Sequence, residues 1–133
     1  QANPLQHCQM LTEAQSRALF EEWNASLQTG DPAAVAKLYR NDAVLLPTVS
    51  KVPRLTPDER IDYFRHFLAD RPSGKLDSLH LSPGCNTMTM AGLYTFNFAV
   101  NGKQVPARYT FTYEWDGAQW LITSHHSSAM PEP

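Results

Sequence analysis

Two adjacent histidines near the end of the chain, His125 and His126, are the side chains whose types most directly suggest chemistry. They stand among serines in "SHHSS", a composition that raises metal binding and nucleophilic catalysis as possibilities. Neighbouring residues of a strand point to opposite faces, so one metal ion could not readily bind both rings. Zinc would need further ligands, such as His80 or Cys85, from another strand. No GxSxG motif surrounds the serines. We therefore expect no metal site and no nucleophilic serine.

Arg108 and Glu114 lie in "QVPARYTFTYEW", where side chains alternate between two faces and these two share one of them. A cation in mid-strand needs a counter-charge or solvent. Two interpretations of Arg108 stay open: a salt bridge to Glu114 or a neighbouring strand, or a cavity in which its planar fork binds a carboxylate or phosphate. Arg54, in the extended passage "VPRL", is either an exposed loop arginine or a second arginine of such a cavity.

Helical patterns dominate the first half of the chain. Residues 11–31 place apolar side chains at three- and four-residue steps and predict an amphipathic helix with Thr12 as its N-cap. Residues 32–42 begin with proline and predict a short second helix that stops near residue 42. Residues 56–74 predict a third helix. Two prolines interrupt residues 43–55, which favours a short edge strand or an extended passage there.

From Lys75 onward the period of apolar residues falls to two, which predicts strands. Four segments follow this pattern, separated by "PG", "AG", "NGK" and "DGA": "KLDSLHLSPGCNTMTM", "GLYTFNFAV", "QVPARYTFTYEW" and "QWLITSHHSS". The dipeptide "NG" is a strong hairpin signal. The second half is therefore expected to be an antiparallel meander. Helices followed by a curved antiparallel sheet make an α+β fold, in which the helices cover one face and leave a conical cavity.

One face of the predicted strands is unusually aromatic. Its members alternate with polar residues and are Tyr94, Phe96, Phe98, Val100, Val105, Ala107, Tyr109, Phe111, Tyr113 and Trp115. Such a surface must be covered, either by the helices or by a second subunit, because large exposed apolar patches usually mark interfaces. We expect homodimerisation through the sheet.

Length and charge exclude several classes of protein. The 133 residues fit one domain, expected at residues 11–133 after an N-terminal extension at residues 1–10. No apolar run approaches the roughly 20 residues that a membrane span needs. The net charge of −2, with acids and bases interspersed, attracts no phosphate backbone. We expect no membrane, nucleic-acid or cofactor partner.

Two cysteines, Cys8 and Cys85, lie too far apart for a CxxC motif. They form either a disulfide or two buried thiols, and a disulfide is the expected outcome because it would hold the polar N-terminal segment in place. The chain begins at Gln1, as a mature protein does after removal of a signal peptide, although a shortened chain would look the same. The expected location is periplasmic or secreted, and otherwise cytoplasmic.

Two longer stretches resemble a known family. "WNASLQTGDPAAVAKLYRNDAVLLPT" resembles the opening of NTF2-like proteins, and "YEWDGAQWLITSHHSSAMPE" resembles the closing hairpin of the calcium/calmodulin-dependent protein kinase II association domain. The resemblance covers Leu11 to Glu132. It implies a cone-shaped α+β barrel, a homodimer or larger homo-oligomer formed through the sheet, and a deep pocket that often holds arginines.

The resemblance also suggests roles for single residues. His126 matches the histidine that ends the family's last strand, which places it toward the pocket and His125 toward the other face, at a subunit interface or in a structural role. Arg108 lies on the strand from which the family projects a pocket arginine, and Arg54 is placed by analogy. These 133 residues hold no kinase domain and no calmodulin-binding basic helix. We expect neither phosphorylation activity nor calmodulin binding.

Enzymes with this scaffold, such as ketosteroid isomerase and the SnoaL-like polyketide cyclases, suggest a second function. A pocket carboxylate there moves a proton beside a hydrogen-bond donor. Glu114 is the candidate base, and His126, Tyr39 or Tyr63 the candidate donor, although an adjacent arginine would lower the pKa of Glu114 and make it a poorer base. Three functions remain. The first is a homo-oligomeric domain that binds a small ligand, and in one version of this hypothesis the ligand is an anion. The others are an isomerase, cyclase or dehydratase, and a purely structural oligomerisation module.

Overall fold

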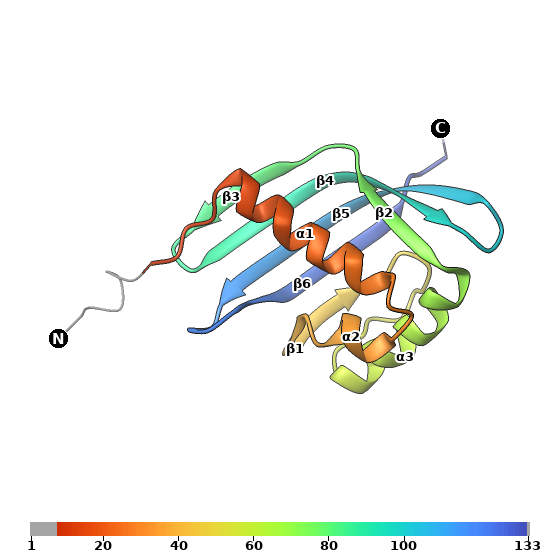
Figure 1. The fold of residues 1–133 in the computed structure, drawn as a ribbon, viewed down its shortest axis with the longest axis horizontal. Coiled ribbons are helices and arrows are strands. Elements are labelled where there is room, and N and C mark those ends of the chain that lie inside the picture. Colours follow the sequence, from red (N-terminus) through yellow and green to blue (C-terminus); the bar gives the residue numbers. More distant parts are fainter. Residues whose placement is uncertain (1–7, 133) are drawn as a thin grey trace.

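The computed structural model describes residues 8–132 and shows six strands in one curved, open sheet, with the long first helix lying across the strands (Figure 1). The strand order is β1-β6-β5-β4-β2, and β3 pairs with β4. The elements are α1 (Glu13–Leu27), α2 (Pro32–Ala36), β1 (Tyr39–Leu46), α3 (Pro57–Phe67), the short 3-10 helix η2 (Leu68–Asp70), β2 (Pro72–Leu76), β3 (His80–Gly84), β4 (Thr87–Phe98), β5 (Lys103–Trp115) and β6 (Trp120–Ala129). The predicted α+β class is confirmed.

Capping boxes start the two long helices where the sequence predicts them. The Thr12 hydroxyl oxygen accepts a hydrogen bond from the backbone N–H of Gln15, and the backbone N–H of Thr12 donates in return to the Gln15 side chain. Thr56 and Glu59 form the same pair at α3. Each box satisfies two backbone N–H groups that the first helical turn would leave without partners. The helices are therefore fixed locally, before any packing against the sheet.

The second helix is shorter than predicted. It ends at Ala36, and Tyr39 already belongs to β1. The reason lies far along the chain. The Leu38 carbonyl, which the Asp42 N–H would use in a longer helix, accepts instead from the backbone N–H of Ile122 on β6. The buried guanidinium of Arg60 donates hydrogen bonds to the backbone carbonyls of Arg40, Asn41 and Ala43 and so holds the segment that follows in place.

β1 is an edge strand, as one interpretation of the prolines predicts, but it runs parallel to β6. The sheet is therefore mixed, but its other pairings are antiparallel, and the consecutive strands β3, β4, β5 and β6 form the predicted meander. The expected turn at Ala91 and Gly92 is wrong, because β4 continues through both residues. A side chain at Gly92 would come within 2.3 Å of the Ser78 carbonyl oxygen, so this glycine permits close approach of two backbones.

The aromatic face of the sheet is buried, as the alternation predicts. Tyr109, Phe111 and Tyr113 are each at most 3% exposed, and α1 contributes Phe20 and Trp23 to the same core. The opposite, outer face of the sheet, defined by Thr89, Ala91, Arg108, Thr110, Thr112, Glu114, Ser124 and His126, carries smaller or polar side chains that remain partly or fully exposed. Val100 is the exception in the predicted aromatic set, because it lies in the turn after β4 and is 60% exposed.

Cys8 and Cys85 form the predicted disulfide, with their Cα atoms 5.0 Å apart. The backbone N–H of Gln9 donates to the side chain of Asn86 at 2.8 Å, and the backbone N–H of Asn86 donates back to the carbonyl of Gln9. The bridge and these two hydrogen bonds attach the start of the described chain to the β3–β4 turn. A disulfide is typical of proteins in an oxidising compartment. None of the helices within residues 8–132 has the length and apolar character needed to cross a membrane.

Replacement of both Cys8 and Cys85 by serine should lower the free energy of unfolding by about 2–5 kcal/mol, because the bridge closes a loop of 77 residues in the unfolded chain. Urea unfolding with and without a reducing agent measures this loss. The control is the serine variant itself, whose stability should not respond to the reductant. Equal stability of both proteins would show that the bridge constrains nothing.

Candidate functional site

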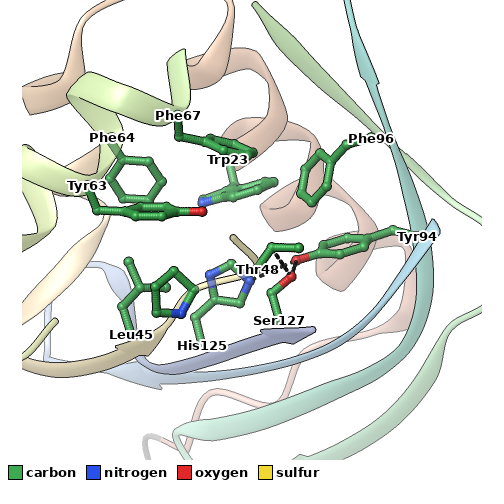
Figure 2. A pocket seen from close by; sticks show the side chains of 11 residues that line it. Trp23, Leu45, Thr48, Tyr63, Phe64, Phe67, Tyr94, Phe96, His125 and Ser127 are labelled. Atoms are coloured by element: carbon green, nitrogen blue, oxygen red, sulfur yellow. Dashed lines mark hydrogen bonds between the residues drawn. The ribbon is translucent and has the colours of Figure 1, made fainter. Parts of the chain in front are cut away.

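A small cavity, here called the inner cavity, lies between the sheet and the helices (Figure 2). Aromatic and apolar side chains form most of its wall. Its polar side chains are Thr48, Tyr63, Tyr94, His125 and Ser127. The free space is about 10 Å³, which is roughly the room that one water molecule needs. The inner cavity therefore admits a single small group rather than a whole ligand.

The structure reverses the predicted orientations of the two histidines. His125 is 3% exposed and points into the core, whereas His126 lies exposed on the outer face of the sheet. The cause is a bulge in β6: Tyr113 pairs with Ile122 while Thr112 pairs with Ser124, so Thr123 is an extra residue. One extra residue moves every later side chain to the other face. This places His125 and Ser127 inside.

His125 forms hydrogen bonds through both ring nitrogens. Its Nδ1 lies 2.8 Å from the Tyr39 hydroxyl, and its Nε2 lies 3.2 Å from the Tyr94 hydroxyl. The ring also stacks on Phe111, with centroids 3.9 Å apart. Behind the histidine, the indole N–H of Trp23 donates to the Tyr39 hydroxyl at 3.1 Å. The ring therefore cannot rotate without breaking both hydrogen bonds and the stacking contact.

The network continues toward the cavity wall. The Tyr94 hydroxyl donates to Ser127 Oγ at 2.6 Å, and Ser127 is hydrogen-bonded to the Thr48 hydroxyl (Figure 2). Thr48 follows β1, Tyr94 lies on β4 and Ser127 on β6. Two strands and the turn after a third, all far apart in sequence, thus supply one connected row of hydroxyl groups.

Burial keeps this network uncharged. It lowers the pKa of His125 to about 3, with the charge of His126 as a second and smaller cause. Burial also raises the pKa of Tyr39 and of Tyr94, and raises that of Tyr63 to about 12. No Asp, Glu, Lys or Arg lines the inner cavity among the residues that the structure describes. The site offers neutral donors and acceptors and holds no charge near neutral pH.

A larger pocket of about 420 Å³, the outer pocket, lies on the other side of Tyr63 and Phe67, which line both spaces. Its remaining wall comes from Val49, Ser50, Arg54, Asp62, His66, Asp70 and Phe98. The residues before α3, α3 itself and the end of β4 therefore meet here. Aromatic rings form its inner side, and charged groups line the rest.

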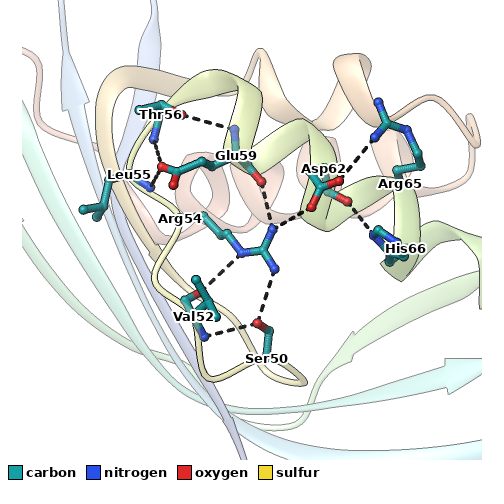
Figure 3. Close-up of polar contacts among 9 residues, drawn as sticks. All are labelled: Ser50, Val52, Arg54, Leu55, Thr56, Glu59, Asp62, Arg65 and His66. Carbon is teal, nitrogen blue, oxygen red and sulfur yellow. Dashed lines mark hydrogen bonds and ion pairs between the residues drawn. The ribbon is translucent and has the colours of Figure 1, made fainter.

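Most of the donor groups of Arg54 already have partners within the protein (Figure 3). Its guanidinium forms an ion pair with Asp62 at 3.1 Å and also donates to Ser50 and to the carbonyl of Glu59. It lies over the ring of Tyr63, 5.5 Å from the centroid, at a cation–π distance. Arg54 does line a pocket, as one interpretation of the sequence predicts, but Asp62 largely balances its charge.

Three predicted site residues lie elsewhere. Arg108 is exposed on the outer face of the sheet and lines neither pocket, which contradicts its predicted place in the cavity. Glu114 lies on the same face and forms an ion pair with Arg40 at 3.3 Å rather than with Arg108. The exposed His126 shares that face. Strand alternation explains the positions of Arg108 and Glu114, which are out of phase with the buried aromatic residues of β5, and the bulge at Thr123 explains that of His126.

Tyr39 and Tyr63 do lie at the candidate site, Tyr39 behind His125 and Tyr63 between the two pockets. Thr48, Ser127 and Tyr94 were not among the predicted site residues. Tyr94 could have been identified, because it belongs to the predicted buried set and its hydroxyl group would need a hydrogen-bond partner there. Nothing in the sequence marks Thr48 or Ser127, because only the tertiary fold brings them together. Within residues 8–132, no three His, Cys, Asp or Glu side chains gather closely enough to hold a metal ion.

A family model and a solved structure of a similar protein point to the same family. Residues 12–131 match the family model of the calcium/calmodulin dependent protein kinase II association domain. A solved structure from Xanthomonas campestris, named as a candidate association domain of this kind, shares 45% identity with a TM-score of 0.85, over 92% of this chain and 91% of that chain. No curated protein shows a significant match to the chain.

More distant structures share the fold alone. An NTF2-like protein with a cystatin-like fold from Novosphingobium aromaticivorans is 17% identical, with a TM-score of 0.71 over 89% of this chain and 81% of that chain. A protein from Streptomyces avermitilis, named as a candidate dehydratase of the NTF2-like family, is 13% identical, with a TM-score of 0.71 over 90% and 97% of the two chains. The NTF2-like architecture expected from the sequence is confirmed.

The low pKa of His125 predicts acid-sensitive stability. The folded-state pKa of about 3 lies below the ordinary value of 6.5, so between these values the unfolded chain binds a proton that the folded chain does not. Stability contributed by the neutral ring is therefore present above about pH 6.5 and lost as the pH falls toward 3, by up to about 1 kcal/mol per pH unit.

Urea unfolding of the wild type and of His125→Gln at several pH values measures this slope. The variant should lose this part of the acid dependence, whatever its absolute stability. His126→Gln is the matched control, because it removes an exposed histidine from the adjacent position and should leave the His125 contribution largely in place. Identical slopes for the wild type and His125→Gln would refute a buried neutral ring.

Proposed function

The chain belongs to the calcium/calmodulin-dependent protein kinase II association-domain family and has an NTF2-like fold, and on this premise we propose that it is a homo-oligomeric domain that binds a small ligand between helices and sheet. The outer pocket holds the body of the ligand. A polar group of the ligand reaches the inner cavity past Tyr63 and Phe67.

The observation that carries this proposal is the convergence of polar side chains in an aromatic enclosure. Thr48, Tyr63, Tyr94, His125 and Ser127 all face one space. Binding sites for small molecules typically combine apolar walls with a few placed polar groups, and a volume of a few hundred Å³ suits them. The outer pocket, of about 420 Å³, lies in that range.

The charge of the lining favours an uncharged ligand. The anionic version of the proposal depended on Arg108 and Arg54, but Arg108 lies on the outer face and Arg54 is paired with Asp62. Asp70 adds a further acid to the outer pocket. An anion would also lose its hydration in the inner cavity without meeting a cation there, which is costly. A neutral ligand with an aromatic or alicyclic body fits the aromatic wall better.

Proton-transfer catalysis has less support than binding. The candidate base Glu114 and the candidate donor His126 lie on the face of the sheet opposite to the cavity. His125 has both ring nitrogens occupied by tyrosine hydroxyls, and burial keeps it neutral. A general base must reach the proton that it removes. The isomerase, cyclase or dehydratase alternative therefore lacks a positioned carboxylate in the inner cavity, among the residues described.

The outer face of the sheet supports self-association. Its centre carries small, uncharged side chains, including Thr89, Ala91, Thr110, Thr112 and Ser124, in paired rows across three strands. Flat surfaces of this kind permit close packing of one sheet on another. We propose that two copies meet through this face, in a dimer or a larger assembly. The periplasmic or secreted location stays part of the proposal, with the disulfide in its support.

Acetophenone, an uncharged aromatic probe, should bind the wild type more tightly than benzoate in an NMR titration, because the lining supplies no free cation. His66→Trp should weaken acetophenone binding by about tenfold, a loss of roughly 1.4 kcal/mol, since the larger ring fills the outer pocket. Arg65→Trp is the matched control: Arg65 is exposed on the same helix but does not line the pocket. Equal effects of the two substitutions, or no binding at all, would reduce the domain to an oligomerisation module.

Light scattering should give the wild type at least twice the mass of one chain. Thr110→Arg should produce monomers, because it places a bulky charge at the centre of the outer face, where two sheets would meet. Thr29→Arg makes the same change at an exposed site in the turn after α1 and should leave the mass unchanged. A Thr110→Arg protein of unaltered mass would place the interface elsewhere.

A further inference from the structure

The hydrogen bonds behind the inner cavity run in one direction. The first donor is the indole N–H of Trp23, which can donate but never accept. It donates to the Tyr39 oxygen, whose second partner is Nδ1 of His125. The single hydrogen of the Tyr39 hydroxyl must then go to Nδ1, since otherwise it would be buried without an acceptor, at a cost of about 1–3 kcal/mol.

This direction fixes the tautomer of His125. A neutral imidazole carries one hydrogen, and because Nδ1 accepts, that hydrogen is on Nε2. Nε2 therefore donates to the Tyr94 oxygen, 3.2 Å away. The Tyr94 hydroxyl in turn donates to Ser127 Oγ. Each group accepts from the one before it and donates to the one after it.

The hydroxyl groups of Ser127 and Thr48, at the end of this row, have one more hydrogen than the row has acceptors for. Ser127 and Thr48 are hydrogen-bonded to each other, and this bond uses only one of their two hydroxyl hydrogens. The other one takes part in none of the hydrogen bonds of this row. If it goes to the neighbouring Tyr63 hydroxyl, the hydrogen of Tyr63 becomes the spare one instead, at the wall of the same cavity. Both side chains line the inner cavity. The chain that begins at Trp23 thus delivers a spare donor to the cavity wall.

We propose that the inner cavity recognises a carbonyl oxygen of an uncharged ligand, with the Thr48–Ser127 pair as the donor and Tyr39, which does not line the cavity, as the residue that sets the donor's direction. This inference rests on the proposed ligand-binding function and names its ligand class. A carbonyl needs no acceptor from the wall, whereas a ligand N–H or O–H does. The free space of about 10 Å³ suits one oxygen atom.

Tyr39→Phe tests the direction without altering the cavity wall. When the Tyr39 hydroxyl is lost, Nδ1 has no partner in either tautomer of His125, so the tautomer with its hydrogen on Nε2 loses the hydrogen bond that favours it. In molecules that take the other tautomer, His125 accepts from Tyr94, the hydroxyls of Ser127 and Thr48 donate back along the row, and the spare donor is absent. Tyr113→Phe is a matched control, because the Tyr113 hydroxyl is equally buried in the same core and has no hydrogen-bond partner.

The experiment compares acetophenone with α-methylstyrene, which has nearly the same shape and a methylene group in place of the carbonyl oxygen. Long-range ¹H–¹⁵N NMR spectra report the His125 tautomer in the same samples. The wild type and Tyr113→Phe should carry the hydrogen on Nε2 and prefer the ketone by about two- to tenfold, the worth of one neutral hydrogen bond. Tyr39→Phe should show a weaker ketone preference and populate the second tautomer beside the first.

Each outcome decides a separate point. Equal binding of both probes to the wild type, or a hydrogen on Nδ1, overturns the carbonyl inference and leaves the ligand-binding function standing. A ketone preference that is undiminished in Tyr39→Phe overturns the directional role of Tyr39. Binding of neither probe overturns the proposed function and the inference with it. If Tyr39→Phe does not fold, the wild-type tautomer and the wild-type probe preference still decide the inference.

Discussion

A single extra residue in β6 determines what the interior of this protein contains. Thr123 interrupts the pairing with β5, so that Ile122 and His125 both face the core although they are three positions apart. Without the bulge, the residues after Ile122 would keep strict alternation, and Ser124 and His126 would face the cavity in place of His125 and Ser127. The neutral network and the spare donor, which need His125 and Ser127 inside, depend on this local shift in register.

The second constraint is the buried guanidinium of Arg60, which lines neither the inner cavity nor the outer pocket. Arg60 is fully buried on α3, and three backbone carbonyls around the start of β1 accept its hydrogen bonds. Its guanidinium also lies 5.9 Å from the ring centroid of Tyr39. The carbonyls satisfy the two terminal nitrogens of the guanidinium, while its Nε has no hydrogen-bond partner among the described residues. Because losing these contacts would leave a buried charge without hydrogen bonds, the arrangement holds the irregular part of β1 in place. Tyr39 owes its position beside His125 to this anchor.

Sequence reasoning succeeded where the determinants are local. Capping boxes mark α1 and α3, and alternation identifies the buried face of β5, because both depend on residues a few positions apart. It failed where distant residues decide: pairing of Leu38 with Ile122 on β6 ends the helical segment early, close approach of Ser78 explains the glycine within β4, and a bulge inverts the histidines. For the site, Tyr63 and Arg54 line pockets and Tyr39 lies behind His125, whereas Arg108, Glu114 and His126 lie on the outer face.

The two faces of the sheet carry different chemistry on the same strands. Ser127 and His125 point to the cavity, while their neighbours His126 and Ser128 point to the outer face, where the proposed contact between copies lies. A shift of β6 by one residue would exchange the two sets completely, because strand side chains alternate. Self-association on the outer face would oppose any such slip, since it adds a second packed surface to the same strands. The assembly proposed for one face would in this way help to preserve the hydrogen-bond direction on the other.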